Sequence, residues 1–256
     1  MPDVSRLMKV EEKRFVAEIK HGKWLLENDP AMQWGWGTPA GQLRAKRRGQ
    51  LIAQGAKLAP GMRALEIGCG TGLFTEMFSK YGAHILAVDL SPDLLSAARQ
   101  KNVPAGQVEF LEAPFEDCDA QSPFDAIIGS SILHHLDCGK SFAKMYQLLK
   151  PGGVISFCEP NMLNPQIWFT LRFRRFFPNI SPDETAFYRK SLYIILQKVG
   201  FIKIRITPFD WLHPQVPEKL IPLVKKVENF IEKLPGVKEF AGSLWLTAQR
   251  PNDKIS

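Results

Sequence analysis

The stretch Ala64-Leu65-Glu66-Ile67-Gly68-Cys69-Gly70-Thr71-Gly72 combines the pattern of a strand, a glycine-rich turn and the start of a helix. The apolar residues before Gly68 suit a buried parallel strand, and a helical pattern begins at Leu73. Glycines at alternate positions let the backbone turn sharply and approach a ligand, because no Cβ stands in the way. The free N–H groups of the following helix would face that ligand. The stretch therefore predicts a ligand-binding loop in an α/β sheet.

A second strand pattern, His84-Ile85-Leu86-Ala87-Val88-Asp89, ends in a carboxylate that is suited to binding the two hydroxyls of a ribose. A dinucleotide and S-adenosylmethionine both fit a glycine loop followed by such an acid. The dinucleotide pattern is Gly-x-Gly-x-x-Gly, whereas this chain has Gly-x-Gly-x-Gly. Glu66 would repel a pyrophosphate but suits a ligand that carries an ammonium and a sulfonium group. These residues favour S-adenosylmethionine.

Five segments, in order from about Met62 to Glu159, resemble the motifs of class I S-adenosylmethionine-dependent methyltransferases, and most resemble the ubiquinone/menaquinone-type subgroup. They are residues 65–72, 87–91, 110–113, 124–136 and 148–153. The resemblance implies an α/β fold with a doubly wound, Rossmann-like sheet of seven mostly parallel strands. It also implies N-terminal helices, C-terminal helical lid insertions, S-adenosyl-L-methionine as cofactor and methyltransferase activity.

The resemblance assigns cofactor binding to residues of the first four motifs. Glu112 stands where the family places an acid near the adenine amino group, although Asp is commoner there. A shift in register would put Glu109, Glu116 or Asp117 in its place. The full predicted set is Glu66, Gly68, Cys69, Gly70, Gly72, Asp89, Leu90, Glu112, Ala113 and Ser130.

Two histidines, His134 and His135, follow the fourth predicted strand, where cofactor and acceptor should meet. In-line positioning of the acceptor supplies much of the rate enhancement. An oxygen or nitrogen acceptor also needs its proton removed, and histidine titrates near neutral pH. At least one of the two is therefore a candidate catalytic base, and the alternative for each is a structural histidine at the sheet edge. Glu159, Tyr188 and His213 are weaker candidates.

No metal site is predicted. Glu116, Asp117 and Asp119 form an acidic loop without histidine, which is typical of a solvated surface. The cysteines are far apart and include no Cys-x-x-Cys pair, so they predict neither a zinc site nor a disulfide framework; they are Cys69, Cys118, Cys138 and Cys158.

Alternating patterns predict strands near residues 62–67, 84–89, 107–112, 124–130 and 153–158, with two more at 201–209 and 243–250. We expect an N-terminal helical cap over residues 1–60 and a methyltransferase domain over 61–256. Insertions at about 161–190 and 211–240 would form the acceptor side.

Two parts of these insertions carry further expectations. The aromatic and arginine-rich segment 167–177 suits a lid or core better than a membrane-bound or nucleic-acid-binding helix, because it does not separate charged from apolar side chains. A helix is expected to start near residues 181–184 and end at Gly200. The helical pattern at 220–234 suggests a helix that covers the sheet.

The composition fits one globular α/β domain, with 256 residues, 45% hydrophobic and 23% charged. The amino terminus lacks the apolar core of a secretory signal, which predicts a cytoplasmic protein. Residues 61–160 carry 7 Lys/Arg against 12 Asp/Glu, whereas 1–60 carry 11 against 6 and 161–256 carry 15 against 8. The basic flanks are either solvated surface or attract a phosphate-bearing substrate, an anionic membrane or a nucleic acid.

The leading functional hypothesis is methyl transfer to a small, hydrophobic acceptor such as a quinone, isoprenoid, lipid or secondary metabolite. The lid-like aromatic residues favour it. So does the sequence Ser130-Ser131-Ile132-Leu133, which stands where related families that methylate amino groups of bases or glutamine have Asn/Asp-Pro-Pro-Tyr. An RNA or protein methyltransferase and a non-catalytic cofactor-binding domain are the alternatives. No stable nucleic-acid partner is expected, and weak peripheral contact with a membrane stays open.

Overall fold

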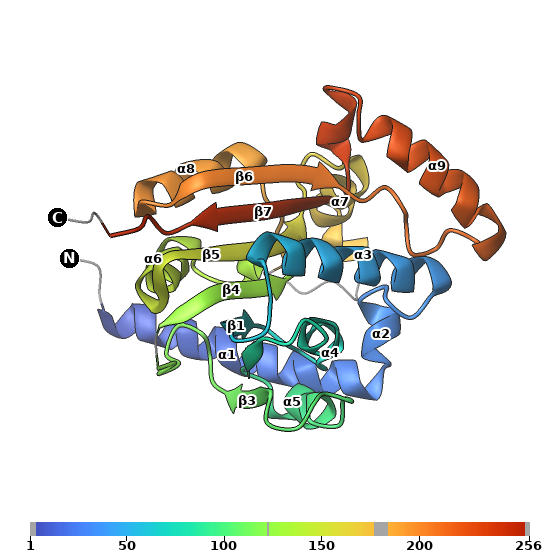
Figure 1. The fold of residues 1–256 in the computed structure, drawn as a ribbon. Coiled ribbons are helices and arrows are strands. Elements are labelled where there is room, and N and C mark those ends of the chain that lie inside the picture. The colour runs from blue at the N-terminus through green and yellow to red at the C-terminus, as the bar shows by residue number, and fades with distance from the viewer. Residues whose placement is uncertain (1–3, 122, 177–183, 254–256) are drawn as a thin grey trace.

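A computed structural model describes residues 4–121, 123–176 and 184–253 of the chain. Within these ranges, seven strands form one sheet in the order β3-β2-β1-β4-β5-β7-β6 (Figure 1). The pairings among β1 to β5 are parallel, and β7 runs antiparallel to both β5 and β6. The strands are β1 Arg63–Ile67, β2 His84–Asp89, β3 Val108–Glu112, β4 Phe124–Ser130, β5 Leu149–Pro160, β6 Ile202–Phe209 and β7 Ser243–Gln249. The predicted fold class is confirmed.

Helices cover both faces of the sheet because neighbouring residues of each strand point to opposite sides. Ile127 of β4 packs in one core with α6 (Cys138–Leu148) and α8 (Arg189–Val199). Ile128 packs in the other core with α3 (Pro39–Ala56), α4 (Leu73–Ser79) and α5 (Pro92–Ala98). The strand order reverses between β1 and β4, and ligands of open α/β sheets bind at the carboxyl ends of strands at such a point.

The N-terminal helices cover the sheet and its carboxyl edge. Helix α1 (Val4–Glu27) packs against α5, and the short α2 is Pro30–Gln33. Helix α3 begins after Thr38, whose side chain accepts a hydrogen bond from the N–H of Gly41, and it packs on β4 and β5. Residues 1–60 thus include a helix that belongs to the covering layer of the sheet. No helix within the described residues has the length and apolar character needed to cross a bilayer.

Helix α9 (Ile221–Ile231) differs from the expected helix packed on the sheet (Figure 1). It packs on α3 through Ile221 and through Arg47, which pairs with Glu228 at 2.8 Å and with Glu232 at 2.6 Å. Glu228 also accepts the backbone N–H of Trp211. The chain leaves the sheet at the end of β6 and then forms α9. The polar face of α9 contacts α3 and the segment that follows β6.

The segment between β5 and α8 also departs from the sequence prediction. Helix α7 (Pro165–Arg172) is followed by a short 3₁₀ turn, Arg174–Phe176, and none of their residues is buried. Segment 167–176 is therefore not core. Residues 177–183, which include most of the predicted helix start, lie outside the described residues. Glu184 is not helical, and α8 begins at Arg189, later than expected. Its end before Gly200 agrees with the prediction.

Candidate active site

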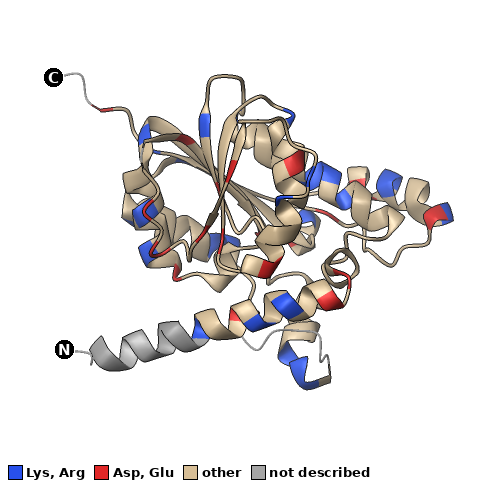
Figure 2. Cartoon of the chain, turned by 90° about the horizontal axis from the view of Figure 1, so that it is seen from below, with Lys and Arg blue, Asp and Glu red and all other residues tan. Residues whose placement is uncertain are grey.

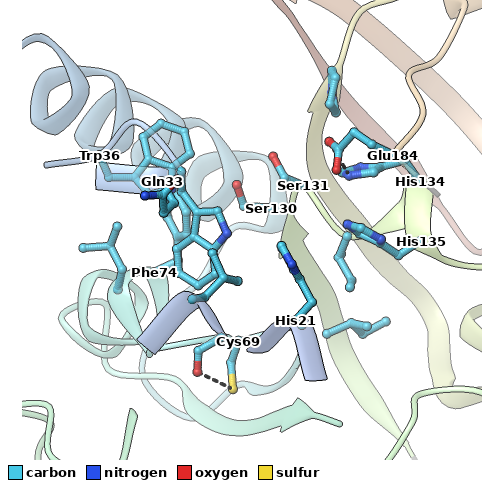
Figure 3. A pocket seen from close by; sticks show the side chains of 18 of the residues that line it. His21, Gln33, Trp36, Cys69, Phe74, Ser130, Ser131, His134, His135 and Glu184 are labelled. Carbon is cyan, nitrogen blue, oxygen red and sulfur yellow. Dashed lines mark hydrogen bonds and ion pairs between the residues drawn. The ribbon is translucent and has the colours of Figure 1, made fainter. Parts of the chain in front are cut away.

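A cavity of about 690 Å³ lies at the carboxyl ends of the central strands. The loops after β1, β2, β3, β4, β5 and β6 contribute to its lining, together with α1, α7 and the loop that holds Trp34 and Trp36. Figure 3 shows Trp36 and Phe74 on one side of the cavity and His134, His135 and Glu184 on the other. The glycine loop and the predicted catalytic histidines therefore share one space.

The glycine loop after β1 uses backbone conformations that favour glycine. Gly68, Gly70 and Gly72 have φ angles of +67°, +53° and +75°. A Cβ at Gly68 would lie 2.5 Å from the Ile132 side chain, and one at Gly70 would lie 3.2 Å from the Trp34 ring. The loop therefore needs glycine both for its backbone angles and for the space beside it.

The carboxylate of Asp89 is fixed at the end of β2. Its Oδ2 accepts the N–H of Gly70 at 2.7 Å, and its Oδ1 accepts the N–H of Ser91 at 2.9 Å. Burial raises the pKa of Asp89 above its ordinary value, although these two N–H groups lower it. Each oxygen keeps a lone pair for a further donor, so the carboxylate can still bind hydroxyl groups in the cavity.

Glu66 is buried and is not part of the cavity lining. Its Oε2 has no hydrogen-bond partner among the described residues. Burial raises the pKa of Glu66 to about 8, and the nearby charge of Asp89 adds to that rise. The side chain is therefore mostly protonated at pH 7, in contrast to the charged carboxylate on which the sequence argument relied.

The predicted cofactor residues divide into two groups. Those that line the cavity are Gly68, Cys69, Gly70, Asp89, Leu90, Ala113 and Ser130. Those outside the lining are Glu66, Gly72 and Glu112. Glu112 is exposed at the end of edge strand β3, whereas Glu116 lines the cavity and accepts a hydrogen bond from Arg14 at 2.6 Å. The acid on this wall is thus Glu116, one of the alternatives considered for Glu112.

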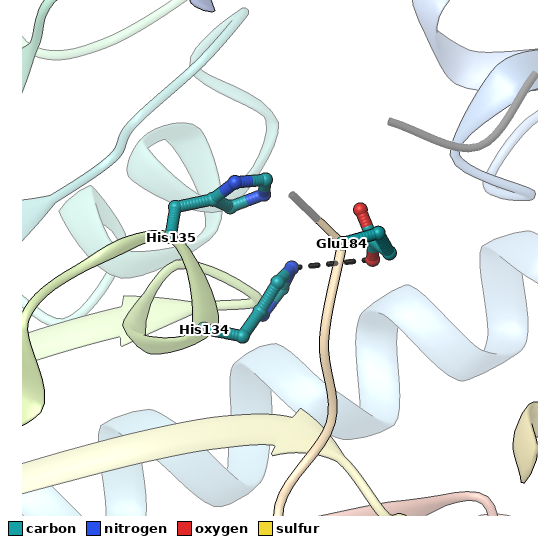
Figure 4. A group of neighbouring side chains, drawn as sticks. All are labelled: His134, His135 and Glu184. Carbon is teal, nitrogen blue, oxygen red and sulfur yellow. Dashed lines mark ion pairs between the residues drawn. The ribbon is translucent and has the colours of Figure 1, made fainter. Parts of the chain in front are cut away.

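His134 is buried between two carboxylates (Figure 4). Its Nδ1 lies 2.8 Å from Glu159 Oε2, and its Nε2 lies 3.2 Å from Glu184 Oε1. Burial alone would lower the pKa of His134, but its bonds to Glu159 and Glu184 outweigh that effect and raise the pKa to about 10. The imidazole is therefore protonated at neutral pH, with both ring nitrogens engaged.

Glu159, one of the weaker candidates, holds the turn that carries the histidines. Its Oε1 accepts the backbone N–H groups of Ile132 and Leu133 at 2.9 and 3.0 Å. These residues lead into the 3₁₀ turn Leu133–His135. Of the remaining candidates, His213 lines the cavity, and Tyr188 is exposed outside the lining.

His135 lies beside His134, with 4.2 Å between the ring centroids. Its Nδ1 is 3.2 Å from Glu18 Oε1 of α1, yet this buried nitrogen makes no hydrogen bond within the described part of the chain. His21, one turn further along α1, also points into the cavity (Figure 3).

Sequence reasoning missed Glu18, His21 and Glu184 as site residues. Glu18 and His21 belong to a helical pattern without a recognisable motif, and Glu184 looked like part of a helix start. The only available signal was the density of charged and aromatic residues in the segments predicted to flank the sheet. Their approach to the histidines depends on how α1 and the segment after β5 pack.

Comparison with known proteins finds a family model that matches the central part of the chain. A model of the methyltransferase domain matches residues 65–157, the span that contains the glycine loop, Asp89 and both histidines. Over this span the chain is similar to the class I S-adenosylmethionine-dependent methyltransferases, the family that the sequence motifs predict. The predicted cofactor, S-adenosylmethionine, is the cofactor of this family.

A curated relative of this chain is the ubiquinone biosynthesis O-methyltransferase of Xylella fastidiosa (strain 9a5c). It is 35% identical over 137 residues, which are 50% of this chain and 55% of the relative. A second one, from Xanthomonas campestris pv. campestris (strain B100), is 34% identical over 127 residues, or 48% of this chain and 53% of the relative. The chain thus spans about half the length of the curated relatives it matches.

A similar solved structure is an S-adenosylmethionine-dependent methyltransferase from Thermotoga maritima. It has a TM-score of 0.62 and 17% identity, and the match covers 90% of this chain and 97% of that chain. At this identity the likeness concerns the fold alone.

Proposed function

We propose that the protein transfers a methyl group from S-adenosylmethionine to a small acceptor. The observation that carries this proposal is the single cavity that joins the glycine loop and Asp89 to the wall of His134, His135 and Glu184. A cofactor bound beside the glycine loop and an acceptor bound beside the histidines would meet inside this cavity. Such positioning supplies much of the rate enhancement in a displacement reaction.

The residues at the glycine loop fit the cofactor. A Cβ would fill the space beside Gly68 and Gly70, and Asp89 keeps lone pairs that can accept hydrogen bonds from ribose hydroxyls. Trp34, Trp36 and Phe74 line the same part of the cavity and supply apolar contact. When bound, S-adenosylmethionine supplies a methyl group on a positively charged sulfur.

On the acceptor side, His135 is the stronger candidate for a proton acceptor. His134 already carries a proton at neutral pH, because Glu159 and Glu184 hold it as an imidazolium. The Nδ1 of His135 lies 3.2 Å from the Glu18 carboxylate, and a ring nitrogen of His135 can accept a proton from an acceptor hydroxyl or amine. His134 would then serve to position the turn and the Glu184 segment.

A hydrophobic acceptor fits the wall that α7 contributes. Ile167, Thr170 and Leu171 line the cavity, while Trp168 and Phe169 on the same helix stay half exposed. This arrangement supports a lid over an apolar pocket. The relationship to ubiquinone biosynthesis O-methyltransferases supports an acceptor with an aromatic or isoprenoid character.

The test uses purified protein, methyl-labelled S-adenosylmethionine and a host extract that is separated into lipid-soluble, small polar, protein and RNA fractions. Label in the lipid-soluble fraction would support the proposed acceptor class. Label in RNA or protein would replace it with the macromolecular alternative. Cofactor binding without label in any fraction would favour a non-catalytic domain.

We further propose weak peripheral contact with an anionic membrane surface, through α9 rather than α7. A stripe of exposed apolar side chains runs along α9 and the 3₁₀ turn before it. Its members, each 48–63% exposed, are Leu220, Leu223, Val227 and Phe230. Exposed lysines recur beside them every seven residues, at Lys219, Lys226 and Lys233. Figure 2 shows Lys and Arg in blue, and many of these positions lie on helices around the sheet. Separated apolar and basic faces suit a surface-bound helix.

Vesicle sedimentation tests this contact. We expect binding to vesicles with phosphatidylglycerol, weaker binding to pure phosphatidylcholine, and loss of binding in the double variant Leu223→Asn with Phe230→Asn. Ile194→Asn, at a half-exposed position of α8, is the control. Absence of vesicle binding, or burial of the stripe in a dimer of this chain, would overturn the contact.

A further inference from the structure

The wall opposite the glycine loop contains a group of side chains suited to a metal ion. Within the described part of the chain, one ligand atom each from His134, His135 and Glu184 lie within 4.8 Å of one another (Figure 4). Two imidazoles and one carboxylate form a ligand set that proteins use for zinc and related divalent transition metals. This group lies apart from the acidic loop 116–119 that the sequence analysis considered and rejected.

We propose that His134, His135 and Glu184 bind a divalent transition-metal ion of the Zn²⁺ class. The inference rests on the proposed methyltransferase function and names an acceptor class for it, a compound with a hydroxyl group.

The spacing of the group is already close to what a metal requires. Two ligands about 2.0–2.1 Å from a tetrahedral ion are about 3.3 Å apart. His134 Nε2 and Glu184 Oε1 are 3.2 Å apart, so an ion could replace the proton between them with little movement. The ligand atom of His135 would have to move closer, which a rotation of a side chain that is only partly buried allows.

The surroundings of the two histidines match those of metal ligands. A ligating histidine usually donates its other ring N–H to a carboxylate or a carbonyl group. The Nδ1 of His134 has this partner in Glu159, whose other oxygen is held by two backbone N–H groups. The Nδ1 of His135 likewise lies 3.2 Å from a carboxylate oxygen, Glu18 Oε1.

All three side chains line the cavity, so the fourth position of a tetrahedral ion would be open to an acceptor. A divalent cation lowers the pKa of a hydroxyl group that coordinates it. The hydroxyl would give its proton to water, and its oxygen would form the bond to the methyl carbon while sulfur keeps the electron pair of the broken carbon–sulfur bond. This route excludes His135 as the base, because its nitrogen would hold the ion.

Co²⁺ titration of chelator-treated protein tests the inference, because Co²⁺ in a site with histidine ligands absorbs visible light. We expect saturation at one Co²⁺ per chain, displacement by Zn²⁺, and at least tenfold weaker binding in both His135→Gln and Glu184→Gln. Glu112→Gln, an exposed acid outside the cavity, should bind Co²⁺ like the wild type.

Failure of the metal site and failure of the proposed function are distinguishable in the same preparation. If the wild type takes up no Co²⁺ saturably, or if both variants bind it as tightly as the wild type does, the proposed metal site is wrong. S-adenosylmethionine binding and label transfer by the chelator-treated protein would then leave the methyltransferase proposal standing. Circular dichroism of each variant excludes misfolding as the cause of lost binding.

Discussion

His134 Nδ1 lies 2.8 Å from Glu159 Oε2, and both side chains are almost completely buried. The pair joins the turn after β4 to the end of β5, because the other oxygen of Glu159 accepts two N–H groups of that turn. A buried carboxylate that loses its partner is strongly destabilising. The two residues therefore act as a unit that fixes the turn of His134 and His135 at the cavity.

This pair predicts a specific dependence of stability on pH. The folded-state pKa of His134, about 10, is above its ordinary value of 6.5. Its stabilising contribution is therefore fully present below pH 6.5 and is lost as pH rises through about 10. We expect the difference in unfolding free energy between wild type and His134→Gln to be largest at pH 6 and smallest at pH 10. Urea unfolding at both pH values measures it, and a constant difference would contradict the assignment.

Glu66 predicts a second pH effect. Its pKa is about 8 in the folded chain and 4.5 ordinarily, so stability falls as pH rises from about 4.5 through 8. Glu66→Gln removes this loss. The difference in melting temperature between Glu66→Gln and the wild type should therefore favour the variant more at pH 9 than at pH 5. Parallel pH profiles for the two proteins would show that Glu66 is not held protonated.

Asp89→Ala should abolish measurable binding of S-adenosylmethionine. The change removes the carboxylate proposed to accept two hydrogen bonds from the ribose hydroxyls, and two hydrogen bonds to a charged group are worth about 3–6 kcal/mol together. Isothermal titration calorimetry measures the affinity. Asp93→Ala, in the first turn of α5, is the control that should bind normally. Unchanged affinity in Asp89→Ala would refute the cofactor site.

Gly70→Val should also abolish cofactor binding, because valine is strained at a φ of +53° and its side chain would meet Trp34. Gly106→Val separates strain from lost binding. Gly106 has a φ of +74° with nothing within 4 Å of a built Cβ, so the variant should lose stability by about 1–3 kcal/mol and keep the affinity. If Gly70→Val binds the cofactor as tightly as Gly106→Val does, the glycine loop is not the binding site.

His135→Ala should keep cofactor affinity and lower turnover by about 10²–10⁴-fold, the usual contribution of a positioned base. Once an acceptor is known, steady-state kinetics with matched calorimetry measures both quantities. The reduction is expected whether His135 takes the proton or holds a cation, and Co²⁺ binding tells the two apart. Normal turnover would remove His135 from the catalytic machinery.

The sequence was enough to predict the sheet, because strand patterns, glycine turns and capping residues act over a few neighbouring positions. It located the glycine loop, Asp89 and the two histidines for the same reason. It could not determine that Glu66 is protonated, that Glu112 is exposed outside the cavity, or that Glu116 lines the cavity. Burial and side-chain direction depend on neighbours from other elements.

Only the tertiary structure decided what surrounds the histidines. Glu18 and Glu184 are separated from them by more than a hundred and by about fifty residues, and no local pattern connects these positions. Packing of α1 against α5, and of the segment after β5 against the turn that follows β4, brings the charges together. At such short distances, carboxylates hold His134 protonated despite its burial, which no sequence motif encodes.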